Sequence, residues 1–320
     1  MDTTEFLERC ARIRREVARA IVGKDAAIDA LLMGTLADGH VLIEDYPGLA
    51  KTLMANSFAR AVDLSFRRIQ FTPDLLPGDV VGGNVFNPRE RSFDFVRGPV
   101  FCHLLLADEI NRATPKTQSA LLEAMQERQV TVDGKRYELE RPFLVVATQN
   151  PIEFEGTYPL PEAQLDRFLM RISIGYPSAE DELAILRRRE ERKADEVAIS
   201  PVVRREELLE MQRHLEDVYS GPDVSRYMVA IAERTRRDAA VQVGVSPRGT
   251  MALFKLARAA AALEGRDFVT PEDVKRVAEM ALAHRIILTA EQWASGGRES
   301  AVIQAVLDEV PTPAALEPRR

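Results

Sequence analysis

A lysine and a threonine stand together after a short apolar run and a tight turn. Residues 41–43 read VLI, as in a buried parallel strand, and residues 45–50 read DYPGLA before Lys51 and Thr52. Apolar residues then recur with helical spacing. Strand, turn, Lys-Thr and helix in this order are the geometry of a phosphate-binding loop, in which backbone N–H groups and a helix N-terminus surround negative charge.

This loop predicts a site for a nucleoside triphosphate and its Mg²⁺ ion. Lys51 would reach the β- and γ-phosphates, and Thr52 would bind Mg²⁺. Asp45 and Ala50 occupy the two glycine positions of the usual pattern G-x-x-x-x-G-K-[ST], although Asp tolerates unusual backbone angles and Gly48 adds freedom. On the loop alone, a plain strand-to-helix turn with an exposed lysine is an equally good interpretation.

Two adjacent carboxylates follow a second apolar run. Residues 101–109 read FCHLLLADE, which places Asp108 and Glu109 directly after a buried-strand pattern. Because ligands bind at the carboxyl edge of a parallel sheet, we expect both side chains near Lys51. Asp108 would bind Mg²⁺, and Glu109 would polarise the attacking water. Asp-Glu after a strand is common by chance and gains weight from the lysine loop upstream.

Three further polar residues are candidates for a role in the hydrolysis of the bound nucleotide. Asn150 follows an apolar run at 143–148, so its amide would lie at the same sheet edge and orient the water. Alone, Asn-Pro after a strand is simply a turn. Arg167 is either a surface arginine or an arginine finger offered to a neighbouring subunit. Arg248, at a helix start, faces either a nucleotide between domains or the solvent.

The elements that position these residues alternate between strands and helices. The patterns predict strands of one parallel sheet at 41–43, 66–71, 104–107, 143–148 and 169–174. They predict helices at 4–20, up to Leu36, after Thr52 and at 115–128, and two inserted hairpins at 80–96 and 129–139. The first hairpin has strands at 80–86 and 93–96. Val22-Gly23 favours a helix-helix turn, which in a nucleotide-binding fold would pack against the adenine.

The pattern changes near Tyr176-Pro177, where we place a domain boundary. From Ser178 onward the sequence predicts helices and no strand: 179–196, 204–219, 223–237, one that Ser246 caps, and one from Thr270 to His284. We therefore expect an α/β P-loop core with a parallel sheet and two inserted hairpins over residues 1–177. An all-α lid domain would cover residues 178–320.

Composition limits the function classes. The 320 residues are 46% hydrophobic and carry a net charge of -7, which disfavours nucleic-acid binding. Cys10 and Cys102 are far apart, which suits a reducing compartment and favours neither a disulfide framework nor a metal site. The N-terminus lacks a signal-peptide pattern, and no run approaches the ~18 apolar residues of a membrane span. We expect a cytoplasmic protein, whose four scattered histidines are structural.

Together these segments resemble the MoxR family of AAA+ ATPases. The resemblance covers about residues 5–308 and rests on the order and spacing of six segments: IVGKD, LIEDYPGLAKT, LLLADEINRA, ATQNP, LPEAQLDRF and VSPRG. MoxR proteins look similar in the glycine-poor loop, although Gly is more usual at the place of Ala50. The resemblance implies that the hairpin at 80–96 is the helix-2 insert and the one at 129–139 the pre-sensor-1 hairpin.

The resemblance also implies a role for each candidate residue. Lys51 and Thr52 match the Walker A motif, and Asp108 and Glu109 match Walker B. Asn150, Arg167 and Arg248 match sensor 1, the arginine finger and sensor 2. Sensor 2 acts on its own subunit's nucleotide in some members of this branch and on a neighbour's in others. The expected catalytic residues are thus Glu109, Asn150, Arg167 and Arg248. The expected nucleotide contacts are Val22, Gly23, Asp45, Pro47, Gly48, Leu49, Ala50, Lys51, Thr52 and Asp108, with Thr52 and Asp108 as Mg²⁺ ligands.

The family resemblance implies a chaperone-like motor. Family members form ring hexamers and use ATP to mature partner proteins or insert their cofactors, and their partners often carry a von Willebrand factor A domain. Two other interpretations stay open: a scaffold that switches on nucleotide binding without hydrolysis, favoured by Asp45 and Ala50, and the ATPase subunit of a metal chelatase. A helicase role ranks low because the second hairpin offers only Lys135 and Arg136. The sequence does not name the client protein.

Overall fold

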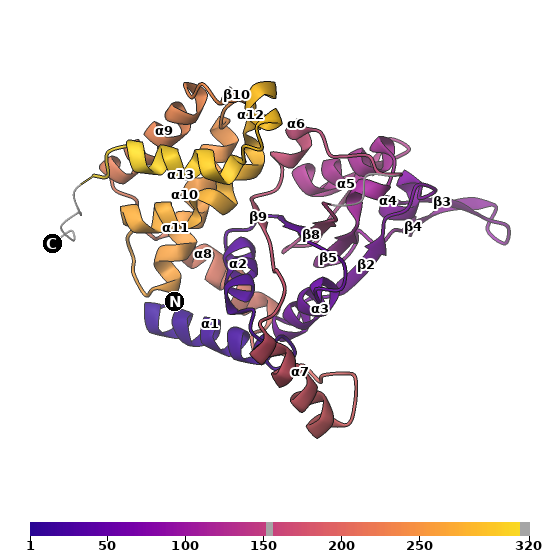
Figure 1. Ribbon diagram of the computed structural model, residues 1–320. Helices are drawn as coiled ribbons and strands as arrows, with labels where there is room; N and C mark the ends of the chain where they lie inside the picture. Colours follow the sequence, from indigo (N-terminus) through magenta and orange to yellow (C-terminus); the bar gives the residue numbers. More distant parts are fainter. Residues whose placement is uncertain (152–155, 314–320) are drawn as a thin grey trace.

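The computed structural model describes residues 1–151 and 156–313 (Figure 1). The first part of the chain contains the helices α1 (Thr3–Ala18), α2 (Asp25–Leu36), α3 (Lys51–Ala61), α4 (Pro77–Val81), η1 (Ile110–Arg112), α5 (Pro115–Glu127) and α6 (Glu162–Leu165). Its strands are β1 (Val41–Glu44), β2 (Phe66–Gln70), β3 (Gly82–Asn87), β4 (Ser92–Arg97), β5 (Leu104–Asp108), β6 (Gln129–Val132), β7 (Lys135–Glu138), β8 (Leu144–Gln149) and β9 (Met170–Ile172).

Five of these strands form one parallel sheet in the order β2-β5-β8-β1-β9. β5 is buried along its whole length, and its residues alternate between two hydrophobic clusters: Leu104 and Leu106 face the α1–α3 side, whereas Leu105 and Ala107 face α5. A strand covered by helices on both faces has no polar side, which explains its uninterrupted apolar run. The expected parallel sheet is confirmed, and its strands all end at one edge.

The C-terminal part packs on the α2 side of the sheet. Its helices are α7 (Ala179–Arg192), α8 (Arg205–Glu216), α9 (Pro222–Arg236), α10 (Pro247–Leu263), α11 (Pro271–Leu282), η2 (Ala283–Arg285), α12 (Ala290–Ala294) and α13 (Glu299–Glu309). α8 and α10 lie against α2, and α11 lies against β9 (Figure 1). Ser246 accepts a hydrogen bond from the Gly249 N–H at 3.2 Å, so it caps α10 as expected.

Two sequence expectations about strands were wrong. The C-terminal part contains a short antiparallel sheet of β10 (Val241–Val243) and β11 (Ile287–Leu288), so it is helical but not all-α. Strands this short give no periodic signal, and only the packing of α10 and α11 brings the two segments together. The first strand of the first hairpin was expected at 80–86, but residues 80 and 81 belong to the helix α4 and the strand β3 begins at Gly82. The helix forms because Pro77 suits a first helical position and Asp79 accepts from the Leu76 N–H at 2.9 Å.

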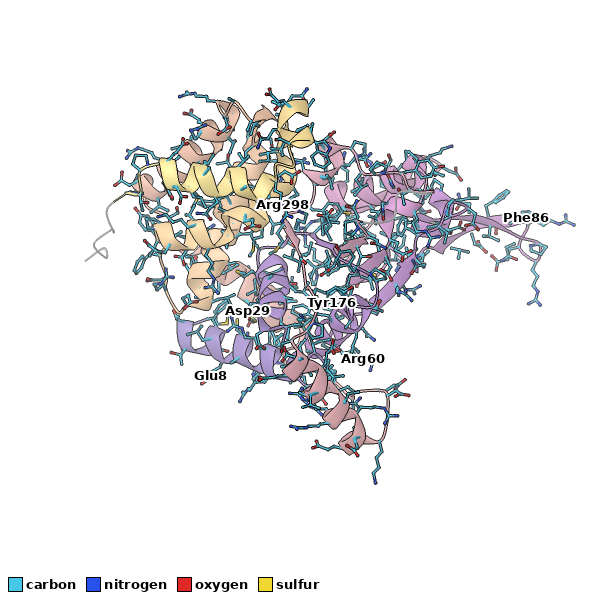
Figure 2. The ribbon with its side chains drawn as sticks, in the orientation of Figure 1. Glu8, Asp29, Arg60, Phe86, Tyr176 and Arg298 are labelled. Carbon is cyan, nitrogen blue, oxygen red and sulfur yellow. The ribbon has the colours of Figure 1, made fainter. Side chains whose placement is uncertain are left out.

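The two inserted hairpins, β3–β4 and β6–β7, touch each other. Phe95 stacks on Tyr137 with ring centroids 3.9 Å apart, and Asn84 donates to Asp133 at 2.6 Å. Asp133 and Gly134 both have positive φ, 48° and 78°, as a type I′ turn requires. The β3–β4 hairpin extends away from the sheet and exposes Phe86 (Figure 2).

Candidate functional site

The loop between β1 and α3 ends in a helix start without a side-chain cap. Ala50, the residue before α3, lies in the left-handed region at φ 56° and ψ 22°, and Gly48 has φ 83°. Neither Ala50 nor the first turn of α3 provides an acidic side chain to its N–H groups. An uncapped helix N-terminus carries partial positive charge and exposed donors, which is the local chemistry of an anion site.

Lys51 lies over this loop. Its Nζ donates to the Asp45 carbonyl oxygen at 2.6 Å and to the Tyr46 carbonyl oxygen at 2.9 Å. The ammonium is therefore held above the turn that leads into α3. A phosphate group bound at the N-terminus of α3 would lie near the Lys51 charge.

The Asp45 carboxylate points away from this turn, into the protein. Its Oδ2 accepts hydrogen bonds from the N–H groups of Ile174 and Gly175, both at 2.6 Å, and from the Ser173 hydroxyl at 3.1 Å. Its Oδ1 accepts from the Tyr46 N–H at 2.9 Å. The residue is buried at 4% exposure. At the first glycine position of the motif, Asp45 thus anchors the loop to the connection after β9.

An apolar pocket of about 290 Å³ lies beside the loop. Val22 lines it, as expected for a residue near an adenine, together with Ile21, Lys24, Gly48, Leu49, Ala50, Leu53, Ile174, Gly175, Pro177 and Ile185. The volume is just below the range of ~300–1000 Å³ that is usual for small-molecule pockets. Gly23 packs instead against α7: with φ 66°, an added Cβ would lie 2.1 Å from Asp181 Cγ.

The carboxylates Asp108 and Glu109 lie at the carboxyl end of β5 and are joined through Thr148 of β8. The Thr148 hydroxyl donates to Asp108 Oδ1 at 2.6 Å and accepts from the Glu109 N–H at 2.8 Å. Glu109 adopts left-handed backbone angles, φ 54° and ψ 50°, which cost a non-glycine residue energy and often mark a functional site.

Three residues that the sequence reasoning missed surround these carboxylates. Arg68 of β2 donates to Asp108 Oδ2 from Nε at 3.0 Å and from Nη2 at 2.7 Å. Glu109 Oε2 accepts from Gln70 Nε2 at 2.7 Å and from Arg112 Nη1 at 2.9 Å. The sequence predicts the strand at 66–71, but its position next to β5 follows only from the sheet order.

Asn150 completes the group at this edge. It directly follows β8, is buried at 5% exposure, and comes after Gln149, whose carbonyl oxygen accepts from the Asp45 N–H at 3.1 Å. The loop at Lys51, the two carboxylates and Asn150 therefore lie at the carboxyl ends of three adjacent strands, β1, β8 and β5. The structure brings these four predicted residues to one edge of the sheet.

Arg167 and Arg248 lie elsewhere. Arg167 follows α6, which Figure 1 places apart from the start of α3, and its Nη1 donates to the Leu122 carbonyl oxygen of α5 at 2.8 Å. Arg248 is exposed in the first turn of α10. The Ser246 hydroxyl contacts both carboxylate oxygens of Asp166 at 3.1 Å, so the two arginines start from neighbouring segments.

The donor set fits Mg²⁺ and a triphosphate. A carboxylate oxygen of Asp108 and the hydroxyl oxygen of Thr52 are the hard ligands that Mg²⁺ prefers, and Mg²⁺ usually keeps several waters besides a few protein ligands. The N-terminus of α3, which has no side-chain cap, and the Lys51 ammonium suit the phosphates, and the apolar pocket at Val22 suits a base.

Comparisons with known proteins agree with this arrangement. The model of the ATPase family associated with various cellular activities (AAA) matches residues 40–170, and the AAA lid domain matches residues 233–306. The chain is 46% identical to the uncharacterized protein YeaC of Bacillus subtilis, over 93% of this chain and 92% of that protein. It is 43% identical to Chaperone MoxR1 of Mycobacterium tuberculosis, over 93% and 81%.

Solved and more distant proteins complete the comparison. The crystal structure of a provisionally named ATPase from Cytophaga hutchinsonii superposes with a TM-score of 0.91 at 40% identity, covering 98% of this chain and 97% of that one. The magnesium-chelatase 38 kDa subunit of Rhodobacter capsulatus is 30% identical over only 57% of this chain. Within the described ranges, no helix is both long and apolar enough to span a membrane. With its AAA segments and its near full-length similarity to MoxR1, this chain belongs to the MoxR family of AAA+ ATPases.

Proposed function

We propose that the protein hydrolyses Mg·ATP at the interfaces between its subunits and uses the energy to remodel partner proteins. The observation that carries this proposal is the meeting of Lys51, Asp108, Glu109 and Asn150 at the carboxyl edge of one parallel sheet, next to an uncapped helix N-terminus. Arg167 and Arg248 leave this edge incomplete, which supports a site completed by a second copy of the chain.

The residues at the edge divide the work of phosphoryl transfer. Lys51 and the amides of α3 hold the phosphates, and Thr52 and Asp108 would hold Mg²⁺, which neutralises charge on the phosphate oxygens when bound. Glu109 accepts the proton of the attacking water and Asn150 orients that water. Nearly all of the rate gain comes from positioning and charge stabilisation.

The arginines act on the neighbouring subunit's nucleotide. An arginine finger supplied in trans contributes roughly 10³–10⁵ in rate. Because Asp166 and Ser246 are in contact, Arg248 would approach the same nucleotide as Arg167. We extend the proposal to a ring homo-hexamer in the cytoplasm, with a von Willebrand factor A domain protein as partner. The name of the relative Chaperone MoxR1 supports the chaperone-like part of the proposal.

A second candidate is a nucleotide-switched scaffold with little hydrolysis. It is favoured by the inward anchoring of Asp45 and by the Arg68–Asp108 ion pair at 2.7 Å, both of which restrain the site. A chelatase ATPase subunit is a weaker candidate because the similarity to magnesium-chelatase subunits covers little more than half of this chain.

The experiment measures phosphate release and ATP retention by three proteins. The wild type should release phosphate, Glu109→Gln should bind ATP and retain it unhydrolysed, and Arg167→Ala should bind ATP with its turnover lowered at least 100-fold. An equal mixture of the two variants should regain activity, because some sites then combine an intact Glu109 from an Arg167→Ala subunit with an intact Arg167 from a Glu109→Gln subunit. Brisk turnover by Glu109→Gln would reject the catalytic carboxylate, and a wild type that binds ATP without releasing phosphate would favour the scaffold.

A further inference from the structure

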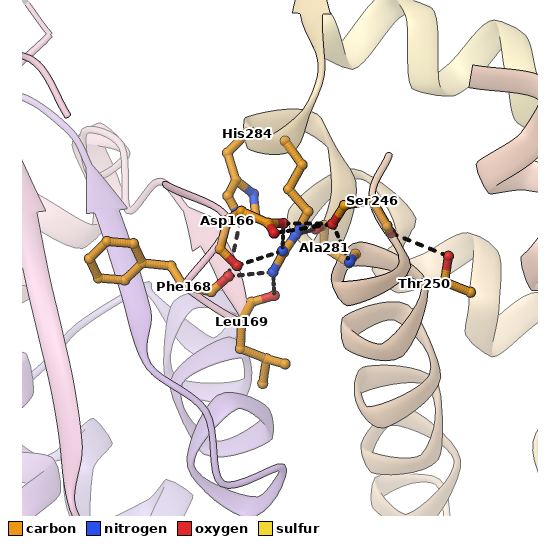
Figure 3. A network of polar contacts seen from close by, with 9 residues as sticks. Asp166, Phe168, Leu169, Ser246, Thr250, Ala281 and His284 are labelled. Atoms are coloured by element: carbon orange, nitrogen blue, oxygen red, sulfur yellow. Dashed lines mark hydrogen bonds and ion pairs between the residues drawn. The ribbon is translucent and has the colours of Figure 1, made fainter. Parts of the chain in front are cut away.

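The guanidinium of Arg285 is committed to the segment that carries Arg167. Its Nη1 donates to the carbonyl oxygen of Asp166 at 2.8 Å and to the carboxylate of the same residue (Figure 3). Its Nη2 donates to the carbonyl oxygens of Phe168 and, at 3.3 Å, of Leu169. The three carbonyls flank Arg167 on both sides, so a single side chain from η2 clamps the backbone around it.

No donor of this guanidinium is left over. Nε donates to the Ala281 carbonyl oxygen at 2.7 Å, so the five N–H groups of Arg285 meet five acceptors. The side chain is 1% exposed, against 21% for Asp166. A planar fork with every donor used cannot rotate or shift without losing several hydrogen bonds at once. The clamp is therefore rigid, and it fixes the path of residues 166–169.

The same carboxylate extends the clamp to the start of α10. The Ser246 hydroxyl contacts both Asp166 carboxylate oxygens at 3.1 Å and also caps α10 through the Gly249 N–H at 3.2 Å. An added Cβ on Gly249 would lie 3.0 Å from Arg285 Cδ, so the first turn of α10 rests on the stem of this arginine. In Figure 3, Asp166, Phe168 and Leu169 lie opposite Ser246 and Ala281 of the helical part.

A contribution to stability does not by itself explain the buried ion pair between Arg285 and Asp166. A buried ion pair often contributes no more to stability than well-packed apolar residues of similar volume, and in some proteins its role is to fix one arrangement of the chain. Here it fixes the two segments from which Arg167 and Arg248 project. The charge of Arg248 also reaches this network: burial lowers the pKa of Arg285, Asp166 raises it, and Arg248 lowers it further.

We propose that Arg285 is a positioning residue for ATP hydrolysis in the neighbouring subunit: through Asp166 and Ser246 it holds the Arg167 segment and the start of α10 as one rigid unit. The inference rests on the proposed function, in which Arg167 completes the neighbour's site. Arg285 itself touches no nucleotide. Its removal should therefore lower the rate at the neighbour's site and leave ATP binding at its own site intact.

The principal test is Arg285→Lys, which keeps the charge but loses the planar fork. We expect kcat to fall about 10- to 100-fold, the cost of a misplaced catalytic group, with KM for ATP within about twofold of the wild type. An equal mixture with Glu109→Gln should restore activity, because the latter subunit supplies an intact Arg167 segment. Loss of stability alone would not be rescued in this way.

The Arg167→Ala mixture with Glu109→Gln serves as the reference. If that reference regains activity and the Arg285→Lys mixture does not, the positioning role is rejected while shared sites stand. If neither mixture regains activity, the proposed sharing of the ATP site between subunits is rejected, and the role of Arg285 that depends on it is rejected with it. An unchanged kcat of Arg285→Lys also overturns the inference.

A second pair of variants covers the case in which Arg285→Lys does not fold. Ser246→Ala removes the Asp166 contact together with a helix cap, whereas Thr270→Ala removes the equivalent cap of α11, where Thr270 accepts from the Asp273 N–H at 3.4 Å. We expect Ser246→Ala to lower kcat at least fivefold more than Thr270→Ala. Equal effects would reduce Ser246 to a helix cap and overturn the extension of the clamp to α10.

Discussion

At the scale of single residues, the site uses left-handed backbone where the sequence has no glycine. Ala50 and Glu109 have φ 56° and φ 54°, one at the start of α3 and one after β5. This region costs an L-residue roughly 1–2 kcal/mol. From this turn the side chain of Glu109, the proposed catalytic carboxylate, accepts hydrogen bonds from Gln70 and Arg112, whereas the exposed Ala50 lines the apolar pocket.

Ala50→Gly should therefore raise the free energy of unfolding by about 0.5–1 kcal/mol, because the relief of strain exceeds the added entropy of the unfolded chain. Chemical denaturation measures this change. Ala305→Gly is the matched control: Ala305 is exposed within α13, and there the same exchange should cost about 1 kcal/mol. Destabilisation of similar size in both variants would contradict the assigned strain.

At the scale of elements, one buried carboxylate joins the loop between β1 and α3 to the chain after β9. Asp45 accepts from the N–H groups of Tyr46, Ile174 and Gly175 and from the Ser173 hydroxyl. Gly175 and Ile174 also line the apolar pocket beside Val22. A change at Asp45 would thus alter the loop and the pocket wall together.

We expect Asp45→Ala to lower the free energy of unfolding by about 3 kcal/mol, because several buried donors lose their acceptor. The amides of Ile174 and Gly175 should exchange hydrogen at least 10-fold faster, which hydrogen-exchange mass spectrometry of that peptide measures. Asp308→Ala, at an exposed position of α13, should stay within about 0.5 kcal/mol of the wild type. Unchanged exchange at Ile174 would show that Asp45 does not anchor the connection.

At the scale of the whole molecule, two buried histidines join separate elements in their neutral form. His40 Nδ1 accepts from the Val145 N–H at 3.0 Å, and its Nε2 lies 3.0 Å from the Met125 carbonyl oxygen, so it links β1, β8 and α5. Burial lowers its pKa to about 4. His284 Nε2 lies 3.3 Å from the Phe168 carbonyl oxygen, and burial followed by the charge of Arg285 lowers its pKa.

Because burial lowers the pKa of both histidines, we expect the protein to lose stability in mild acid. Between the unfolded pKa of 6.5 and the folded value of about 4, the unfolded chain binds a proton that folded His40 does not, so stability falls as the pH falls through this window. The loss for His40 reaches about 3 kcal/mol at the lower end. Urea unfolding at a series of pH values gives the free energy of unfolding as a function of pH. This free energy should change less steeply with pH in His40→Gln than in the wild type, and still less steeply in His40→Gln/His284→Gln. Equal slopes would refute the assignment.

Much of the core and its edge follows from local patterns. Residues 41–43, 104–107 and 143–148 are apolar without interruption, apart from Thr148 at the end of the last run, because strands covered on both faces have no polar side. Each run is followed by its candidate polar group. Parallel strands end at one edge, so the order of these runs is enough to predict that Lys51, Asp108 and Asn150 meet there. The cap of α10 at Ser246 is equally local.

Other features required the tertiary structure, because they depend on which elements become neighbours. Arg68 and Gln70 reach Asp108 and Glu109 because β2 lies beside β5 in the sheet. Asp45 points inward because residues 173–175 donate hydrogen bonds to its carboxylate. The strands β10 and β11 are too short for a periodic signal. Arg285 lies more than a hundred positions after Asp166 in the chain. The sequence by itself determined the chemistry of the strand ends, since it is local, whereas the partners that hold those groups were decided by packing between distant segments.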